Sequence, residues 1–175
     1  ILTSDHGEGI AGHRWVTKEM LYEEPVTVPL IIRWPGVIPS GSFDTVHLAS
    51  SIDIAPTLYD YAAITDQGEL PGRSLRSAIE DPETPNCQYI VAELQPAKER
   101  MELKGRMIRT PSYKYMAFSA GTHPEMFFDL DEDPLEMVNQ ARSETHQKVL
   151  LEHRELLDSW VKQTNDDFET ASVQL

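Results

Sequence analysis

A long amphipathic segment near the end of the chain is the feature that most constrains the fold. Between residues 143 and 166, apolar residues recur at spacings of three and four, which predicts one long helix with a single apolar face. The stripe consists of Val149, Leu150, His153, Leu156, Leu157, Trp160 and Val161. A helix with one apolar face must bury it against another element, so its partner should lie elsewhere in the chain.

Four short runs upstream of that helix have the composition of strands. They are rich in β-branched and aromatic residues, are separated by turn residues, and cover residues 89–92, 105–109, 113–118 and 126–130. This pattern is typical of an antiparallel sheet. We therefore expect residues 83–175 to form a small antiparallel sheet covered by the long C-terminal helix, with a frayed tail at 167–175.

The first half of the chain has a different pattern. Apolar strand-like runs and helical segments alternate, which favours an α/β architecture. The expected strands are 1–4, 28–34 and a short one at 46–48, and the expected helices are 17–24, one beginning at Ser51 and 75–80. The Pro-rich stretch 81–86 is the best boundary, so the predicted domains are 1–82 and 83–175. Because the chain opens without Met inside a strand-like run, we expect residues 1–82 to be the end of a larger α/β core.

Composition excludes several classes of function. The formal net charge of −14 argues against a nucleic-acid partner, which would need a basic surface. No apolar run reaches the roughly 18 residues of a membrane span. The single cysteine, Cys87, excludes an internal disulfide framework, and we expect it to be a plain structural thiol.

The candidate chemistry lies in the loop that follows the first apolar run. Asp5 and His6 stand together at the predicted strand end, where a carboxylate and an imidazole can reach one divalent ion. Gly7 lets the backbone bend there. His13 and Lys18 follow and would supply a proton donor and a cation, which suits a tetrahedral oxyanion. Taken singly, an Asp-His pair usually makes only turn hydrogen bonds, and a lone lysine is usually solvated.

The joint pattern resembles the sulfatase family. The residues that carry the resemblance are Thr3-Ser4-Asp5-His6-Gly7, His13, Trp15, Lys18 thirteen positions after Asp5, Tyr22-Glu23-Glu24, and Val28-Pro29-Leu30-Ile31 leading to Trp34-Pro35-Gly36. A second match lies downstream, in Arg109 to Tyr115 and in Met126 to Asn139, which is similar to the family's Tyr-Asp-Leu and Asp-Pro signature. Two residues depart from the family pattern, Gly12 for a frequent Glu and Phe128 for a usual Tyr.

The resemblance implies an alkaline-phosphatase-like α/β fold and hydrolysis of sulfate esters, with sulfated small molecules or glycans as substrates. In such enzymes a Cys or Ser becomes formylglycine, whose hydrate attacks sulfur. Asp5 and His6 would then be the late ligand pair of a divalent metal, with calcium implied and manganese or another ion left open by the imidazole. Lys18 and His13 would bind the substrate and take part in catalysis.

The nucleophile motif and the family's early aspartates do not occur in these 175 residues. We therefore expect the chain by itself to be inactive, to bind metal weakly or not at all, and to self-associate through the apolar runs 1–4 and 30–34. Family members are often periplasmic, secreted or lysosomal, and the residues do not choose among these compartments.

Two other functions stay open at this point, a phosphodiester or phosphonate monoester hydrolase of the same superfamily and a non-catalytic module.

Three further interpretations concern charges outside the loop. Arg106, Arg109 and Lys114 are interpreted as solvated strand charges, Lys98 to Arg100 as a possible substrate rim, and the acids of 129–139 as turn caps.

Overall fold

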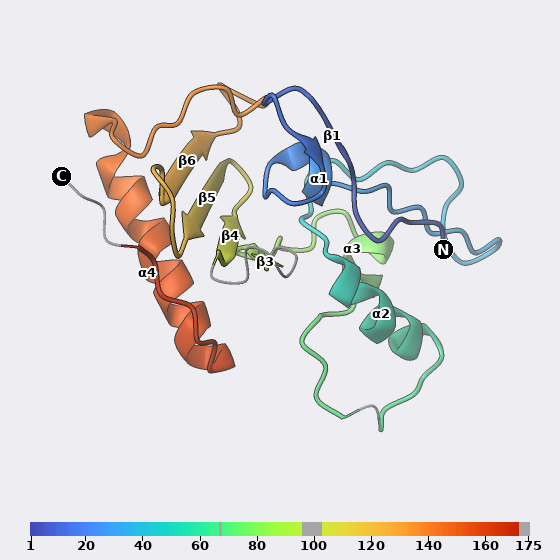
Figure 1. The fold of residues 1–175 in the computed structure, drawn as a ribbon. Coiled ribbons are helices and arrows are strands. Elements are labelled where there is room, and N and C mark those ends of the chain that lie inside the picture. The colour runs from blue at the N-terminus through green and yellow to red at the C-terminus, as the bar shows by residue number, and fades with distance from the viewer. Residues whose placement is uncertain (67, 96–102, 172–175) are drawn as a thin grey trace. The chain divides into compact units, whose positions relative to one another are not determined.

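The structure is a computed structural model and describes residues 1–66, 68–95 and 103–171. It divides into two compact units. Figure 1 colours the chain by residue number, from blue at the N-terminus to red at the C-terminus. The first unit comprises residues 1–5 and 29–90, and the second comprises residues 6–28 and 91–175. Residues 6–28 thus group with the C-terminal sheet. The predicted domains, residues 1–82 and residues 83–175, stay a prediction.

A four-stranded sheet, in which the last three strands pair antiparallel, forms the centre of the second unit. Its strand order is β3-β4-β5-β6, so each strand lies beside its neighbour in sequence. The strands are β3 (Ile90–Leu94), β4 (Gly105–Arg109), β5 (Tyr113–Phe118) and β6 (Glu125–Asp129). The register pairs Met107 with Met116 and Met116 with Met126, so these three side chains share one face. The predicted antiparallel sheet is confirmed.

The long C-terminal helix α4 (Gln147–Thr164) follows a short 3-10 turn (Glu144–His146) and contacts β4 and β5 (Figure 1). It buries Leu150, His153 and Leu157 at the predicted spacing of three and four. It ends at Asn165, which adopts the left-handed conformation common at helix ends. The predicted pairing of sheet and helix is therefore confirmed.

Two ion pairs join this helix and the segment after it to the sheet. Arg154 makes a two-pronged contact with Glu125, with N–O distances of 2.8 and 2.6 Å. Arg106 likewise binds Asp166 at 2.6 and 2.9 Å. Paired contacts of this kind between Arg and carboxylate are strong and directional, so they fix how the helix crosses the strands.

The other face of the sheet packs against the segment that contains Leu21. Leu21 is 2% exposed and lies in one cluster with Met107, Met116, Phe118 and Phe128. Because side chains alternate along a strand, this cluster is separate from the residues that face α4. The sheet is thus covered on one face by the helix and on the other by residues from the start of the chain.

The segment 6–28 differs from the predicted helix at 17–24. It forms a small hairpin of β1 (Gly9–Ile10) and β2 (Val16–Thr17), followed by the short helix α1 (Glu23–Val26). Thr17 has a φ of 84°, which cannot begin a right-handed helix. Helical composition was therefore overridden by strand pairing at Val16 and Thr17.

The first unit is mostly loops around three helical segments. A 3-10 turn (Ser51–Asp53) leads directly into α2 (Ile54–Tyr61), and α3 (Arg76–Glu80) follows. The helices beginning at Ser51 and near residue 75 are therefore confirmed. The buried carboxylate of Asp53 accepts hydrogen bonds from the backbone N–H groups of Ser50 at 2.8 Å and Arg73 at 2.9 Å, which joins the two segments.

The predicted strands of the first unit are wrong in extent. Residues 1–4 and 28–34 meet only at Leu2 and Ile31, whose backbones exchange two hydrogen bonds of 2.9 Å. Residues 46–48 form no strand. A strand requires a ladder of pairs, and one reciprocal pair gives only an isolated bridge. None of the described helices is long and apolar enough to span a membrane.

Candidate functional site

The loop that carries the predicted site is held by a close approach of two backbone segments. The Gly7 N–H donates to the Pro25 carbonyl at 2.8 Å. A Cβ atom at Gly7 would lie 2.1 Å from the Glu24 carbonyl oxygen, nearer than any real contact. Only glycine fits here, so the bend predicted for Gly7 has a steric reason. The contact fixes His6 next to helix α1.

His6 and Lys18 are brought together by this arrangement. Lys18 Nζ lies 3.0 Å from His6 Nε2, although the two residues are twelve apart in the chain. His6 Nδ1 lies 2.6 Å from the Gly7 carbonyl oxygen, so the Nδ1–H donates there and Nε2 presents its lone pair to the Lys18 ammonium. The contact places a cation beside an imidazole lone pair, and the catalytic role that the family resemblance implies for Lys18 stays a prediction.

Asp5 is joined to His6 by one peptide bond and is the last residue of the first segment of the first unit. Its exposed carboxylate accepts a hydrogen bond from the Ser4 hydroxyl at 3.3 Å. Carboxylate oxygen suits a hard cation such as calcium, and imidazole nitrogen suits manganese and later metals. Among the residues that the structure describes, no group of three or more His, Cys, Asp or Glu side chains is placed to hold a metal. Asp5 and His6 thus offer the oxygen and nitrogen donor types of a divalent-metal site, and their role as ligands stays a prediction.

His13 lies in the turn of the small hairpin and is held by an aromatic stack. Its ring is parallel to that of Tyr22 within 2°, with centroids 3.7 Å apart. The Tyr22 hydroxyl in turn approaches Met126 Sδ at 3.5 Å. The structure thus places His13 against Tyr22 and not in the hydrogen bond of His6 with Lys18. Its predicted role at the substrate stays a prediction.

A buried ion cluster lies behind helix α1 and was missed from the sequence. Lys114 is fully buried, and its Nζ lies 2.7 Å from Glu23 Oε1 and 2.7 Å from Glu136 Oε1. It also donates to the Leu21 carbonyl at 3.1 Å. We name Glu23, Lys114 and Glu136 the Lys114 triad. The interpretation of Lys114 as a solvated charge is wrong, because two distant carboxylates neutralise it inside the protein.

The pKa values of the two carboxylates of the triad are shifted in opposite directions. Burial raises the pKa of Glu136, and the neighbouring Glu23 carboxylate adds to this effect against the Lys114 ammonium. Burial also acts to raise the pKa of Glu23, but Lys114 and Arg109 outweigh it, so that pKa lies below its usual value. Glu136 Oε2 accepts a hydrogen bond from the Glu23 backbone N–H at 2.6 Å. The triad therefore binds both the side chain and the backbone at the start of α1.

The other two strand charges are not solvated either. Arg106 is 5% exposed and bound to Asp166, and Arg109 Nε lies 3.6 Å from Glu23 Oε1. The alternative rim residues Lys98 to Arg100 lie outside the described residues. Strand alternation alone did not reveal these partners, since each carboxylate comes from a distant segment.

The acidic motif of 129–139 has the predicted structural role. Asp129 Oδ1 accepts the backbone N–H groups of Asp131 at 3.1 Å and Glu132 at 3.3 Å, as a turn cap does. Asn139 Oδ1 accepts the Phe127 N–H at 3.0 Å. The exception is Glu136, whose carboxylate reaches the triad.

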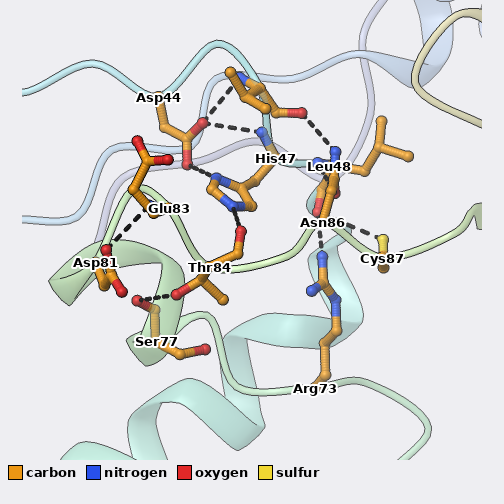
Figure 2. Close-up of polar contacts among 11 residues, drawn as sticks. Asp44, His47, Leu48, Arg73, Ser77, Asp81, Glu83, Thr84, Asn86 and Cys87 are labelled. Atoms are coloured by element: carbon orange, nitrogen blue, oxygen red, sulfur yellow. Dashed lines mark hydrogen bonds and ion pairs between the residues drawn. The ribbon is translucent and has the colours of Figure 1, made fainter.

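A second polar cluster lies entirely within the first unit (Figure 2). His47 Nδ1 lies 2.7 Å from Asp44 Oδ2, and His47 Nε2 lies 2.7 Å from the Thr84 carbonyl oxygen. The Thr84 carbonyl and the Asp44 carboxylate both favour the imidazolium, which raises the pKa of His47. Asn86 binds the backbone of the same loop through the Leu48 N–H at 2.9 Å. Cys87 lies nearby, and burial raises the pKa of its thiol, as expected for a structural cysteine.

Comparisons of the chain with known proteins give a family match and similar sequences. A family model described as N-sulphoglucosamine sulphohydrolase, C-terminal, matches residues 11–163. The Delta 4,5-hexuronate-2-O-sulfatase of Bacteroides thetaiotaomicron is 34% identical over 176 residues, which is 99% of this chain and 36% of that protein.

Solved structures agree with the family match. A protein in complex with its substrate, D-glucosamine-2-N,6-O-disulfate, superposes with a TM-score of 0.83 at 29% identity, over 94% of this chain and 34% of that one. The phosphonate monoester hydrolase of Agrobacterium radiobacter gives a TM-score of 0.76 at 29% identity, over 92% of this chain and 34% of that one.

The chain spans about a third of the length of the relatives it matches. Its α/β architecture, with an antiparallel sheet and a C-terminal helix, is that of the alkaline-phosphatase-like sulfatases, as expected from the sequence. Because the family model covers residues 11–163, most of the chain, the chain belongs to the sulfatase family as a sulfatase C-terminal region.

Proposed function

We propose that the protein containing this chain hydrolyses sulfate esters and that residues 5–18 form one side of its active site. The observation that carries the proposal is the 3.0 Å contact of Lys18 Nζ with His6 Nε2, in a chain that belongs to the sulfatase family. A cation held beside a potential metal ligand can help to neutralise a tetrahedral anion, because the anion could contact both the cation and a metal bound to that ligand.

The proposed substrates are sulfated glycans. The relatives support this class by their names, which include a hexuronate-2-O-sulfatase and an N-acetylglucosamine-6-O-sulfatase, both from Bacteroides thetaiotaomicron. The similar protein solved in complex with its substrate, D-glucosamine-2-N,6-O-disulfate, supports it as well. The sugar and the sulfated position are not proposed, since those relatives differ in both.

The residues of this chain have distinct proposed roles. Asp5 and His6 would hold a divalent metal, with calcium favoured by the carboxylate. His6 Nε2 would then bind the metal in place of its hydrogen bond with Lys18, whose ammonium would turn to the sulfate beside it. A bound metal would polarise the ester, and formylglycine elsewhere in the protein would supply the nucleophile. Lys18 would bind the sulfate and stabilise the charge that develops on the leaving oxygen. His13, fixed on Tyr22, would donate a proton to the leaving group.

A second candidate is hydrolysis of phosphonate monoesters or of phosphodiesters. The specific observation in its favour is the similarity to a phosphonate monoester hydrolase over 92% of this chain. Sulfate monoesters carry one negative charge, as do the monoesters of phosphonates, so one lysine suits both. A non-catalytic role is a third reading, and it would require a full protein without a nucleophile.

The test uses the full-length protein and two matched arylesters, a nitrophenyl sulfate and a nitrophenyl phenylphosphonate. We expect turnover of the sulfate, and loss of that turnover in Lys18→Ala. Faster turnover of the phosphonate ester would favour the second candidate, and no turnover of either would favour a non-catalytic module. The 175-residue chain alone should turn over neither.

Self-association of the isolated chain also stays a prediction. Leu2 and Ile31 form the isolated bridge, yet they are 59% and 57% exposed. Large apolar side chains in such a position tend to be covered by another surface. Light scattering over a concentration series of the isolated chain would test this, and a monomer throughout would contradict it.

A further inference from the structure

We propose that the Lys114 triad positions the active-site loop, so that the C-terminal sheet acts on the reaction without touching the substrate. This inference rests on the proposed function. The triad joins three segments that are distant in sequence, namely α1 through Glu23, β5 through Lys114 and the turn after β6 through Glu136.

The contacts of residues 21–25 connect the triad to the loop. On one side of this segment, the Leu21 carbonyl accepts from Lys114 at 3.1 Å and the Glu23 N–H donates to Glu136 at 2.6 Å. On the other side, the Pro25 carbonyl accepts from Gly7 at 2.8 Å. The segment is therefore held by the triad and in turn holds the residue that follows His6.

A second connection runs through the ring of Tyr22. Its neighbour Glu23 is bound by Lys114, and the Tyr22 ring stacks on His13 with centroids 3.7 Å apart. The same ring lies 6.1 Å from Phe128, in the apolar cluster of the sheet. Both His6 and His13 thus depend on one short segment, and the triad sets the position of that segment on the sheet.

Burial makes the triad a rigid support. Lys114 is fully buried, the Glu136 side chain is 1% exposed, and the Glu23 side chain is 34% exposed at the edge of the triad. An unpaired charge at such a depth is costly, so the three groups hold each other in one arrangement. Arg109, 3.6 Å from Glu23, adds a second cation and limits the repulsion between the two carboxylates. A shift of the segment by about 1 Å at a catalytic loop can reduce a rate by about a hundredfold.

The chain offers a matched control for a test. Arg106 is also a buried cation on the same sheet, and it binds Asp166 near the end of α4 instead of the segment 21–25. Lys114→Met and Arg106→Met both remove a buried cation that pairs with two carboxylates, which are Glu23 and Glu136 for Lys114 and Asp166 and Glu93 for Arg106. They should destabilise the protein by similar mechanisms, but only the first should release the loop.

The experiment compares full-length wild type, Lys114→Met and Arg106→Met by hydrogen–deuterium exchange and by kinetics with nitrophenyl sulfate. We expect amides of residues 6–18 to exchange about five- to thirtyfold faster in Lys114→Met and to be unchanged in Arg106→Met. We expect kcat to fall about tenfold or more in the first variant alone.

Unchanged exchange of residues 6–18 in Lys114→Met would overturn the proposal, as would equal losses of kcat in both variants. If Lys114→Met does not accumulate as folded protein, Glu136→Gln replaces it, because it keeps the shape and removes one charge. The exchange readout needs no sulfatase activity. Faster exchange in a protein that hydrolyses no sulfate ester would therefore support the positioning and refute only the proposed function.

Discussion

The Lys18 ammonium lies 3.0 Å from Nε2 of His6, and this contact joins the two ends of a hairpin that separates them by twelve residues. The contact gives Lys18 a fixed position although its side chain is exposed. In the proposed active site, that position decides how well the ammonium meets the sulfate.

Replacing Lys18 by Met should therefore reduce kcat of the full-length protein by about a hundred- to a thousandfold, the effect of losing one preorganised charge stabiliser. Steady-state kinetics with a nitrophenyl sulfate would measure it. The control is Lys148→Met, since the Lys148 side chain is 89% exposed on α4 and should leave kcat unchanged. An unchanged kcat in Lys18→Met would remove Lys18 from the proposed site.

Asp5→Asn and His6→Ala should each weaken metal binding by the full-length protein by about tenfold or more, because each removes one proposed ligand. Calcium and manganese titrations followed by calorimetry would measure the two affinities. Asp131→Asn is the control, since Asp131 is an exposed carboxylate in the turn after β6. Equal metal affinity in all three variants would show that this loop holds no metal.

The fold of the second half of the chain could be predicted well because its signals are local. The strands Gly105–Arg109 and Tyr113–Phe118 have the expected bounds, and the turn between them contains Pro111, which ends one strand and allows the next to begin. The stripe of α4 is equally local, since residues three and four apart lie on one face of any helix.

Predictions failed where distant residues decide the outcome. Lys114 is buried because Glu23 and Glu136 reach it from segments 91 residues before it and 22 residues after it, and no spacing rule relates them. Thr17 enters a strand because it pairs with Gly9. The proximity of His6 and Lys18 was predicted through a family resemblance, whereas the geometry of the hairpin that creates it was not.

Gly7→Ala should disturb the loop more than Gly12→Ala, although both glycines lie near Glu24. At Gly7 the added Cβ would meet the Glu24 backbone oxygen at 2.1 Å, whereas at Gly12 it would meet the flexible end of the Glu24 side chain at 2.3 Å. Backbone cannot move aside cheaply, so we expect Gly7→Ala to cost about 1–3 kcal/mol and Gly12→Ala less than about 1 kcal/mol. Thermal denaturation of both variants would measure the difference, and equal midpoints would contradict the backbone contact.

The last prediction concerns His47 and pH. Its two ring nitrogens face the Asp44 carboxylate and the Thr84 carbonyl, and the Arg73 cation opposes them only weakly, so the pKa of His47 is raised in the folded state. A raised pKa stabilises the fold fully below the unfolded value of about 6.5, and this stabilisation is lost as pH rises through the folded value.

Wild type should therefore lose stability more steeply than His47→Gln as pH rises above about 6.5. The same comparison with His123→Gln controls for loss of an exposed histidine. Denaturation midpoints of the three proteins at half-unit pH steps would measure the slopes. Parallel curves of midpoint against pH for wild type and His47→Gln would contradict the prediction. They would mean that protonation of His47 does not stabilise its contacts with Asp44 and Thr84.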